Sequence, residues 1–389
     1  MGLNPVVVIA LSMFVLAQSQ TQDCGQTPRA ETPAPVPPTP TQPSSDVITT
    51  QDGARVQAQV VVTNLEVPWS MAFAPDGRLF VTERPGRVRI IDIAGGTSEL
   101  ALTLDDTFAQ GEAGTLGLAL DPDFAASRFV YVYYSARAGN GAVNRVVRYR
   151  EVGSRLGERV VLLDGIPADT IHDGGRIRFG PDGLLYISTG DASTQPLAQS
   201  LGSTAGKILR LNRDGTTPAG NPFGSPVYSY GHRNPQGFDW HPITGELWAS
   251  EHGATGNDEI NVIRAGANYG WPAIQANATM AGMITPVTFF ASAIAPSGAS
   301  FARGRAVPLF ENDLFVATLR GLHLLRLRID PAVSGRIVAQ ERLFDQRFGR
   351  IRDVITGPDG FLYFCTNNRD GRGTPGASDD LIARVVPAS

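Results

Sequence analysis

Short apolar segments alternate with turn sequences along most of the chain. One pattern recurs six times: an apolar stretch, a turn that is Pro-Asp-Gly or similar to it, and a strand-like run rich in Leu, Phe, Tyr and Val. The copies read FAPDGRLFVTER, LDPDFAASRFVYVYY, FGPDGLLYISTGD, WHPITGELWASEHG, AVPLFENDLFVATLRG and TGPDGFLYFCTNN, with prolines at positions 75, 122, 181, 242, 308 and 358. Proline presets the first turn dihedral, aspartate bonds back to the turn backbone and glycine takes the left-handed position. Each copy therefore predicts a β-hairpin.

A hairpin cannot bury both of its faces by itself, whereas sheets arranged radially cover one another. Six units of this length, each able to supply a four-stranded sheet, predict an all-β protein with the fold of a six-bladed β-propeller. A large β-sandwich is the competing interpretation. Because loops from every blade of a propeller converge at one end of its channel, we expect functional residues to be scattered, one or two in each repeat.

Composition supports this picture and excludes several classes of partner. The 389 residues include 43 glycines and 28 prolines, which suits many turns that join short strands. A formal charge of -4 provides no basic field for nucleic acid or an anionic membrane. The two cysteines, Cys24 and Cys365, are too few for a disulfide framework or a cysteine-based metal site.

The first 48 residues lack the repeated pattern. The apolar run at 6–17 is too short to span a bilayer and fits the core of an export signal, although no Lys or Arg precedes it. We therefore expect a signal peptide at 1–22, a Pro/Thr-rich disordered linker at 23–48 and the propeller at 49–389, with a periplasmic or secreted location. Cys24 lacks the small apolar residues that precede a lipoprotein cysteine, so export is favoured over a lipid anchor. Because the apolar run at 6–17 is short, no transmembrane span is expected.

The stretch TIHDGGRIRFGPDGLLYISTGD, at 170–191, has the strongest signs of a functional site. It places His172 before Gly174 and Gly175, which permit backbone angles and close contacts that a Cβ would forbid, and its hairpin ends at Asp191. A lone histidine in a loop is more often structural than catalytic. Other polar, glycine-bounded segments in neighbouring repeats make the functional interpretation the stronger one here.

Five fragments in order carry a family resemblance: PWSMAFAPDGRLFVTERPGRV, IHDGGRIRFGPDG, GHRNPQG, SEHGATGNDEIN and NYGWP. The chain resembles, over about residues 55 to 387, the soluble sugar dehydrogenases that use pyrroloquinoline quinone (PQQ), the glucose/sorbosone and aldose sugar dehydrogenase family. The resemblance implies a six-bladed propeller with PQQ across the channel mouth, in agreement with the repeat count. It also implies oxidation of the C1 hydroxyl of aldoses to lactones, with electrons passed to an external acceptor.

The same resemblance assigns roles to individual residues. His172 corresponds to the general base and Asp191 to the carboxylate that orients it; an imidazole is suited to take a proton from an alcohol near neutral pH. The cofactor-binding residues that it implies are Arg233, Asn234, Arg320, Arg350 and Arg352, with Glu112 as a further candidate to touch cofactor or substrate. Arginines offer planar forks of donors to a planar triacid.

The segment HGATGNDE resembles the loop whose main-chain carbonyls bind the Ca2+ that also contacts PQQ. Gly253 and Ala254 occupy the two carbonyl positions, and alanine retains the carbonyl oxygen where relatives commonly have proline. Two alternatives stay open: a Ca2+-dependent lactonase propeller and a non-catalytic extracellular binding propeller. The sequence does not tell which sugar is preferred, which acceptor is used or whether the protein dimerises.

Overall fold

The computed structural model describes residues 1–2 and 47–388. Apart from residues 1–2 and 47–48, the predicted signal peptide at 1–22 and the predicted linker at 23–48, with Cys24, lie outside the described residues, so these expectations stay predictions. In the part of the chain that is described, no helix is long and apolar enough to cross a membrane.

Six antiparallel β-sheets make up most of the regular structure of the described residues. Five of them are formed by four consecutive strands each: Pro68–Phe73 (β3), Leu79–Glu83 (β4), Arg87–Asp92 (β5) and Thr97–Thr103 (β6); Thr115–Leu120 (β7), Phe129–Ala138 (β8), Gly141–Val152 (β9) and Arg155–Pro167 (β10); Ile177–Phe179 (β11), Leu185–Thr189 (β12), Lys207–Leu211 (β13) and Val227–Tyr230 (β14); Pro235–Trp240 (β15), Leu247–Glu251 (β16), Asp258–Ile263 (β17) and Thr288–Phe290 (β18); Pro296–Phe301 (β19), Leu314–Thr318 (β20), Leu324–Ile329 (β21) and Ile337–Leu343 (β22).

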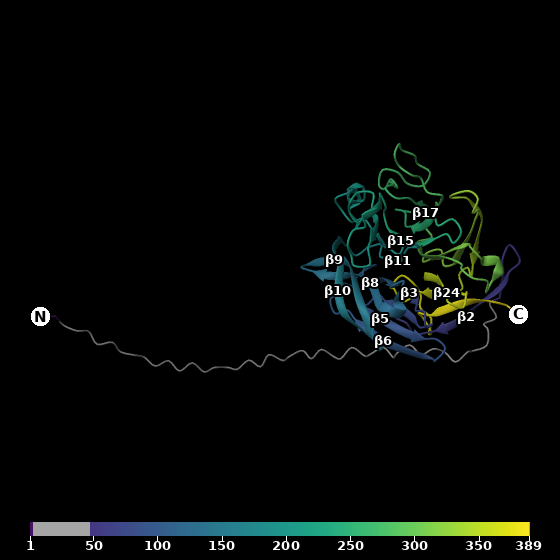
Figure 1. Ribbon diagram of the computed structural model, residues 1–389, viewed down its shortest axis with the longest axis horizontal. Coiled ribbons are helices and arrows are strands. Elements are labelled where there is room, and N and C mark those ends of the chain that lie inside the picture. Colours follow the sequence, from purple (N-terminus) through teal and green to yellow (C-terminus); the bar gives the residue numbers. More distant parts are fainter. Residues whose placement is uncertain (3–46, 389) are drawn as a thin grey trace. The chain divides into compact units, whose positions relative to one another are not determined.

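The sixth sheet joins the two ends of the described propeller. It contains Ile48–Thr49 (β1), Arg55–Val62 (β2), Ile351–Thr356 (β23), Leu362–Thr366 (β24) and Ile382–Pro387 (β25), in the order β1-β2-β25-β24-β23. The pairing of β2 with β25 closes the ring and satisfies backbone groups that two sheet edges would otherwise expose. The prediction of a six-bladed propeller is confirmed, and Figure 1 shows β3, β11 and β15 near its centre with β6, β9 and β10 at its rim.

The six repeated prolines lie in the links β3–β4, β7–β8, β11–β12, β15–β16, β19–β20 and β23–β24, each between two neighbouring strands of one sheet, as the turn pattern predicts. Two of these links are helical instead of tight turns: Phe124–Ser127 (α1) forms one helical turn, and Pro308–Phe310 (η2) forms a 3-10 turn. Both copies lack the Pro-Asp-Gly glycine that the left-handed turn position needs. A further 3-10 turn, Gln195–Gln199 (η1), lies between β12 and β13.

Apolar side chains fill the space between neighbouring sheets. Phe80 of the first sheet, for example, is buried in one cluster with Val130 and Tyr134 of the second. Such burial of apolar area is the main stabilising contribution to a radial arrangement of sheets.

The innermost strand of each sheet (β3, β7, β11, β15, β19 and β23) lines the central channel, and polar side chains fill part of it. The buried Arg176 donates to Asp353 across the channel over 3.0 Å, from Nη1 to Oδ2, and its guanidinium lies 4.4 Å from the ring of Trp69. Cavities lie at the two ends of the inner strands: Gln236 and Arg352, near the starts of β15 and β23, line one, whereas Trp240 and Ile355, near the ends of these strands, line the other. The ion pair of Arg176 and Asp353 lies between them.

Candidate active site

The loop before β11 holds His172 in an unusual backbone conformation. Its φ of 64° is left-handed, which a residue with a side chain adopts only when its surroundings impose it. Two glycines explain how the loop packs so tightly: a Cβ on Gly174 would lie 2.7 Å from the carbonyl oxygen of Ser188, and one on Gly190 would lie 1.8 Å from that of His172. The glycines therefore allow the loop to pack directly on the end of β12.

Both ring nitrogens of His172 have defined partners. Nδ1 lies 2.8 Å from Oδ1 of Asp191, and Nε2 lies 2.8 Å from Nη2 of Arg233. A carboxylate only accepts and a guanidinium only donates, so these contacts require a proton on Nδ1 and a lone pair on Nε2. The ring therefore has the tautomer that a general base needs, with its basic nitrogen directed away from Asp191.

Asp191 is fully buried and makes several hydrogen bonds. Its Oδ1 also accepts from the backbone N–H of Ser193 over 3.0 Å, and its Oδ2 accepts from Nε1 of Trp271 over 2.8 Å. The guanidinium of Arg233 lies 5.3 Å from the Trp271 ring. Trp271 belongs to the fragment NYGWP, but nothing in that fragment predicts its contact with Asp191.

Next to this pair is a cavity of about 660 Å3 at the end of the channel where the inner strands begin. Six of the predicted site residues line it: Glu112, Gly253, Ala254, Arg320, Arg350 and Arg352. The other four lie around the histidine loop: His172 contacts Asp191 and Arg233 directly, and Oδ1 of Asn234 accepts from the backbone N–H of Gly174 in that loop over 2.9 Å. Hydrogen bonds from His172 N to Glu112 and from Arg233 to the His252 carbonyl connect this group to the cavity wall.

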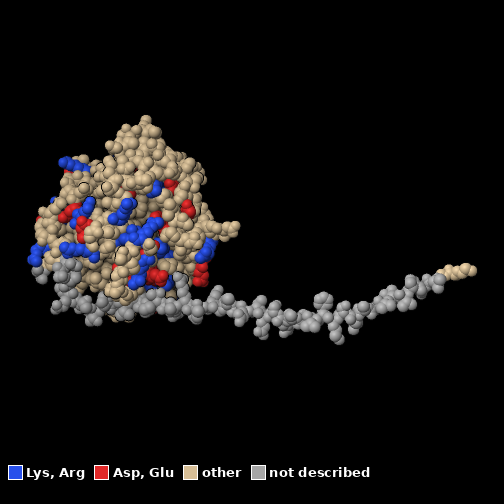
Figure 2. Space-filling model, turned by 180° about the vertical axis from the view of Figure 1, so that it is seen from behind, with Lys and Arg blue, Asp and Glu red and all other residues tan. Residues whose placement is uncertain are grey.

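The arginines give the cavity a positive charge that the protein does not fully neutralise. Arg352 is buried and donates only to neutral groups, Gln236 Oε1 and Ser297 Oγ, and burial together with the charge of Arg350 lowers its pKa to about 9. Arg350 itself is paired with Asp370 over 2.7 Å. Arg320 is exposed, and its side chain makes no hydrogen bond or ion pair with any described residue. Figure 2 shows basic side chains gathered near the centre of one face of the molecule.

Buried polar atoms around the cavity lack partners. Arg233 Nε, Asn234 Nδ2, His252 Nε2 and Arg352 Nε are all shielded from solvent and make no hydrogen bond with the described residues. An unsatisfied buried donor is costly, and native structures usually satisfy it with water or a ligand. Together with the uncompensated arginines, these atoms suit an anionic ligand with several acceptor groups.

Glu112 places a further negative charge beside the histidine loop. Burial opposes its ionisation, but nearby cationic charge, from His252 when protonated and from Arg372, lowers its pKa to about 2. Its Oε1 accepts from Arg372 over 2.7 Å, and its Oε2 accepts from the backbone N–H of His172 over 3.4 Å. Arg372 also lines the cavity, and no motif in the sequence singled it out.

The loop with the proposed calcium positions is organised by Asp258. Oδ1 of this buried carboxylate accepts from the N–H of Gly253 over 2.8 Å, and Oδ2 accepts from the N–H groups of Ile294 and Ala295. Within the described ranges, no group of three or more His, Cys, Asp or Glu side chains is placed to hold a metal ion. A calcium site here would therefore depend on main-chain oxygens, as the prediction for Gly253 and Ala254 states.

His252 is a further site residue that the sequence analysis missed, although it belongs to the quoted segment SEHGATGNDEIN. Burial, with smaller contributions from Arg352 and Arg233, lowers its pKa to about 4, so its ring is neutral near neutral pH. It lines the cavity together with Gln236, Gly253 and Ala254. A lone histidine beside a loop motif gives no sign in the sequence that its ring is buried at the cavity.

Comparisons with known proteins show the family to which the chain belongs. The family model "Glucose / Sorbosone dehydrogenase" matches residues 65–381. The aldose sugar dehydrogenase of Escherichia coli is 33% identical and covers 82% of this chain and 92% of its own. The PQQ-bound aldose sugar dehydrogenase of Streptomyces coelicolor is 36% identical, with a TM-score of 0.77 over 86% of this chain and 98% of its own. A solved Thermus protein, described as a putative glucose dehydrogenase, is 44% identical, with a TM-score of 0.79 over 85% of this chain and 100% of its own.

Proposed function

The chain belongs to the glucose/sorbosone dehydrogenase family, and we propose that it is a PQQ-dependent enzyme that oxidises the C1 hydroxyl of aldose sugars to lactones. One observation carries the proposal: an oriented His172–Asp191 pair lies beside a cavity whose wall holds arginines without carboxylate partners. The pair suits removal of a proton from an alcohol, and the arginines suit an anionic cofactor.

The residues of the cavity fit PQQ, which is a planar triacid. Arg233, Arg320 and Arg352 have no carboxylate within ion-pair distance among the described residues, so their charges are available to the cofactor. The free Nδ2 of Asn234 and Nε of Arg352 add donors from within the wall. Arg350 is already paired with Asp370, so we assign it the smaller share of cofactor charge.

When bound, PQQ would serve as the two-electron acceptor for the hydride of sugar C1 and would pass those electrons to an external acceptor. The protein's own contribution is to accept the proton: the lone pair of His172 Nε2 accepts from Nη2 of Arg233 in this structure, and it can take the proton of the C1 hydroxyl when that guanidinium turns to the cofactor. Asp191 then stabilises the imidazolium through Nδ1–H, and Trp271 holds Asp191 in place. Because Glu112 is anionic, we assign its contact to the sugar hydroxyls instead of to the triacid.

Reconstitution tests this function directly. Purified protein should oxidise aldoses with an artificial acceptor dye only after PQQ and Ca2+ are added, and the product should be the lactone. A lactonase would instead hydrolyse a lactone without PQQ, and a binding propeller would bind sugar without reducing the dye. Either of those results would contradict the proposal.

We expect PQQ binding to depend on Ca2+ held by the carbonyl oxygens of Gly253 and Ala254, since a hard cation provides a counter-charge that arginines on one side cannot complete. A chelator should abolish activity and release PQQ, and excess Ca2+ should restore both. PQQ binding can be followed by its absorbance during titration. If chelated protein retained its full affinity for PQQ, the calcium site at these two residues would be wrong.

Asp191→Asn should reduce turnover less than loss of His172. Asparagine retains a side-chain group next to Nδ1 but removes the charge that stabilises the imidazolium. We expect turnover to fall by no more than roughly 10²-fold, the lower end of what a positioned proton acceptor contributes. The measurement is turnover at saturating sugar with PQQ content determined in parallel. A wild-type rate in this variant would remove Asp191 from the mechanism.

A further inference from the structure

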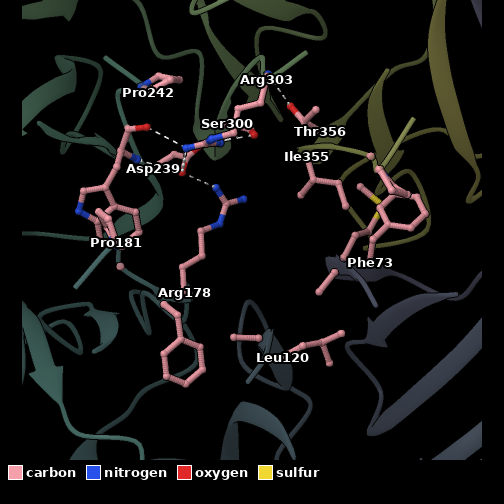
Figure 3. A pocket seen from close by; sticks show the side chains of 18 of the residues that line it. Phe73, Leu120, Arg178, Pro181, Asp239, Pro242, Ser300, Arg303, Ile355 and Thr356 are labelled. Atoms are coloured by element: carbon pink, nitrogen blue, oxygen red, sulfur yellow. Dashed lines mark hydrogen bonds and ion pairs between the residues drawn. The ribbon is translucent and has the colours of Figure 1, made fainter. Parts of the chain in front are cut away.

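The end of the channel opposite the candidate active site holds a second cavity, of about 900 Å3. The ends of the inner strands and the turns after them form its wall, which is mostly apolar: Phe73, Leu120, Phe179, Trp240 and Ile355, with the turn residues Pro75, Pro181, Pro242 and Pro358. Figure 3 shows several of these side chains around the open centre. The ion pair of Arg176 and Asp353 separates this cavity from the catalytic one, so the second cavity has no part in the function proposed above.

The charged side chains in this wall are Asp239, Arg178 and Arg303. Asp239 is buried, and it accepts two hydrogen bonds from Arg303: Nη1 to Oδ2 over 2.5 Å and Nη2 to Oδ1 over 2.9 Å. Arg303 also donates to the carbonyl oxygens of Trp240 and Phe301. Its hydrogen-bonding capacity is therefore largely used within the wall. His241 also lines the cavity, and burial lowers its pKa, so it adds no positive charge near neutral pH.

Arg178 is different, because most of its donors are free. Its Nη1 lies 3.1 Å from Oδ1 of Asp239, but Nε and Nη2 have no partner among the described residues. In Figure 3 its side chain extends from the wall so that the guanidinium lies in the open centre of the cavity. Two arginines against one aspartate leave a net charge of +1, and the free donors of Arg178 carry it into an apolar space.

We propose that this second cavity binds an organic monocarboxylate with an apolar body, such as a medium-chain fatty acid or an aryl carboxylate. The planar fork of Arg178 matches the two oxygens of a carboxylate and leaves one negative charge to balance one positive charge. The apolar wall removes the chain or ring of the ligand from water, whereas a polyhydroxy acid would lose hydrogen bonds with water there. The ligand class is thus distinct from both the sugar and the triacid of the first site.

Calorimetric titration of the PQQ- and Ca2+-loaded enzyme with octanoate tests this site. Octanoate should bind to one saturable site with a Kd on the order of 1 mM or tighter, while 1-octanol and gluconate should bind at least tenfold more weakly. Arg178→Gln should weaken octanoate binding at least tenfold. The fold should survive this change, because Arg303 still pairs with Asp239. Arg213→Gln is the matched control: this exposed arginine pairs with Asp121 and does not line the cavity, so octanoate should bind to that variant as to wild type.

Sugar oxidation provides an independent readout. Arg178→Gln should oxidise sugar at the wild-type rate, and octanoate should not compete with the sugar, because the two cavities are separate. Equal binding of octanol and octanoate, or unchanged octanoate binding by Arg178→Gln, would overturn the proposal. Competition between octanoate and the sugar would place the ligand at the first site and overturn it as well. If the enzyme did not oxidise sugar in the presence of PQQ, the proposed function would be wrong, but the titration would still show whether octanoate binds to the second cavity.

Discussion

Replacing His172 with Gln or Ala should reduce turnover by roughly 10² to 10⁴, the usual contribution of a positioned proton acceptor. The lone pair on Nε2 belongs to an imidazole that Asp191 orients from the other side, and neither replacement provides a base of comparable strength there. PQQ should still bind, because Arg233, Arg320 and Arg352 are unchanged. The measurement is turnover at saturating sugar, normalised to PQQ content.

The control for this experiment is a histidine elsewhere in the channel. His241 lines the opposite cavity, and its Nδ1 accepts from the backbone N–H groups of Ile243 and Thr244, which a glutamine oxygen can also satisfy. His241→Gln should therefore oxidise sugar at the wild-type rate. If His172 variants reduced the acceptor dye as fast as wild type, proton abstraction would belong to another group, and Glu112 would be the next candidate.

The fold was predictable because its signal is local and repeated. Each copy of the pattern, Pro-Asp-Gly in three cases and a related turn in the other three, predicts a pair of neighbouring strands by itself, and six copies specify the number of blades. The closing pair of β2 and β25 was not predictable in the same way, since Arg55–Val62 carries no turn motif that separates it from an outer strand of the first sheet. Ring closure depends on residues more than 300 positions apart, and no periodicity within one repeat encodes that contact.

The site was predictable where single segments carry it. His172, its glycines and Asp191 lie within one hairpin, and the structure places them as that stretch indicates. Contacts between blades could not be read from one sequence. Trp271 reaches Asp191 from the next blade, and Arg372 reaches Glu112 from the last one. The roles of all these residues in catalysis and cofactor binding stay predictions until the variants are measured.

The ion pair of Arg350 with Asp370 could not be predicted from the sequence around Arg350. The resemblance implies the same role for Arg350 and Arg352, and both line the cavity. Their surroundings differ, however: Asp370 neutralises Arg350, whereas Arg352 faces only neutral acceptors. Arg350 and Arg352 can therefore contribute unequal positive charge to an anionic ligand, although they are only two positions apart in the sequence. Their partners come from different segments of the chain.

Arg176→Met should destabilise the propeller by about 3–5 kcal/mol, the usual cost of leaving a buried charge without its partner. Both side chains of the Arg176–Asp353 pair are buried, and Arg176 also donates to Ser70 Oγ and to the Gln236 carbonyl, so its loss affects three sheets. Asp353 would keep only the backbone N–H of Met71, which cannot balance a full negative charge. The measurement is the midpoint of denaturant unfolding, checked for reversibility by refolding.

The double variant Arg176→Met/Asp353→Asn separates this electrostatic effect from a loss of packing. Asparagine can still accept from Met71 but carries no charge, so the double variant should be more stable than Arg176→Met alone, although it loses the same arginine contacts. A packing effect would instead make the double variant at least as unstable as the single one. A wild-type midpoint for Arg176→Met would show that water entering from the neighbouring cavities solvates Asp353, and that the pair does not separate the two ends of the channel.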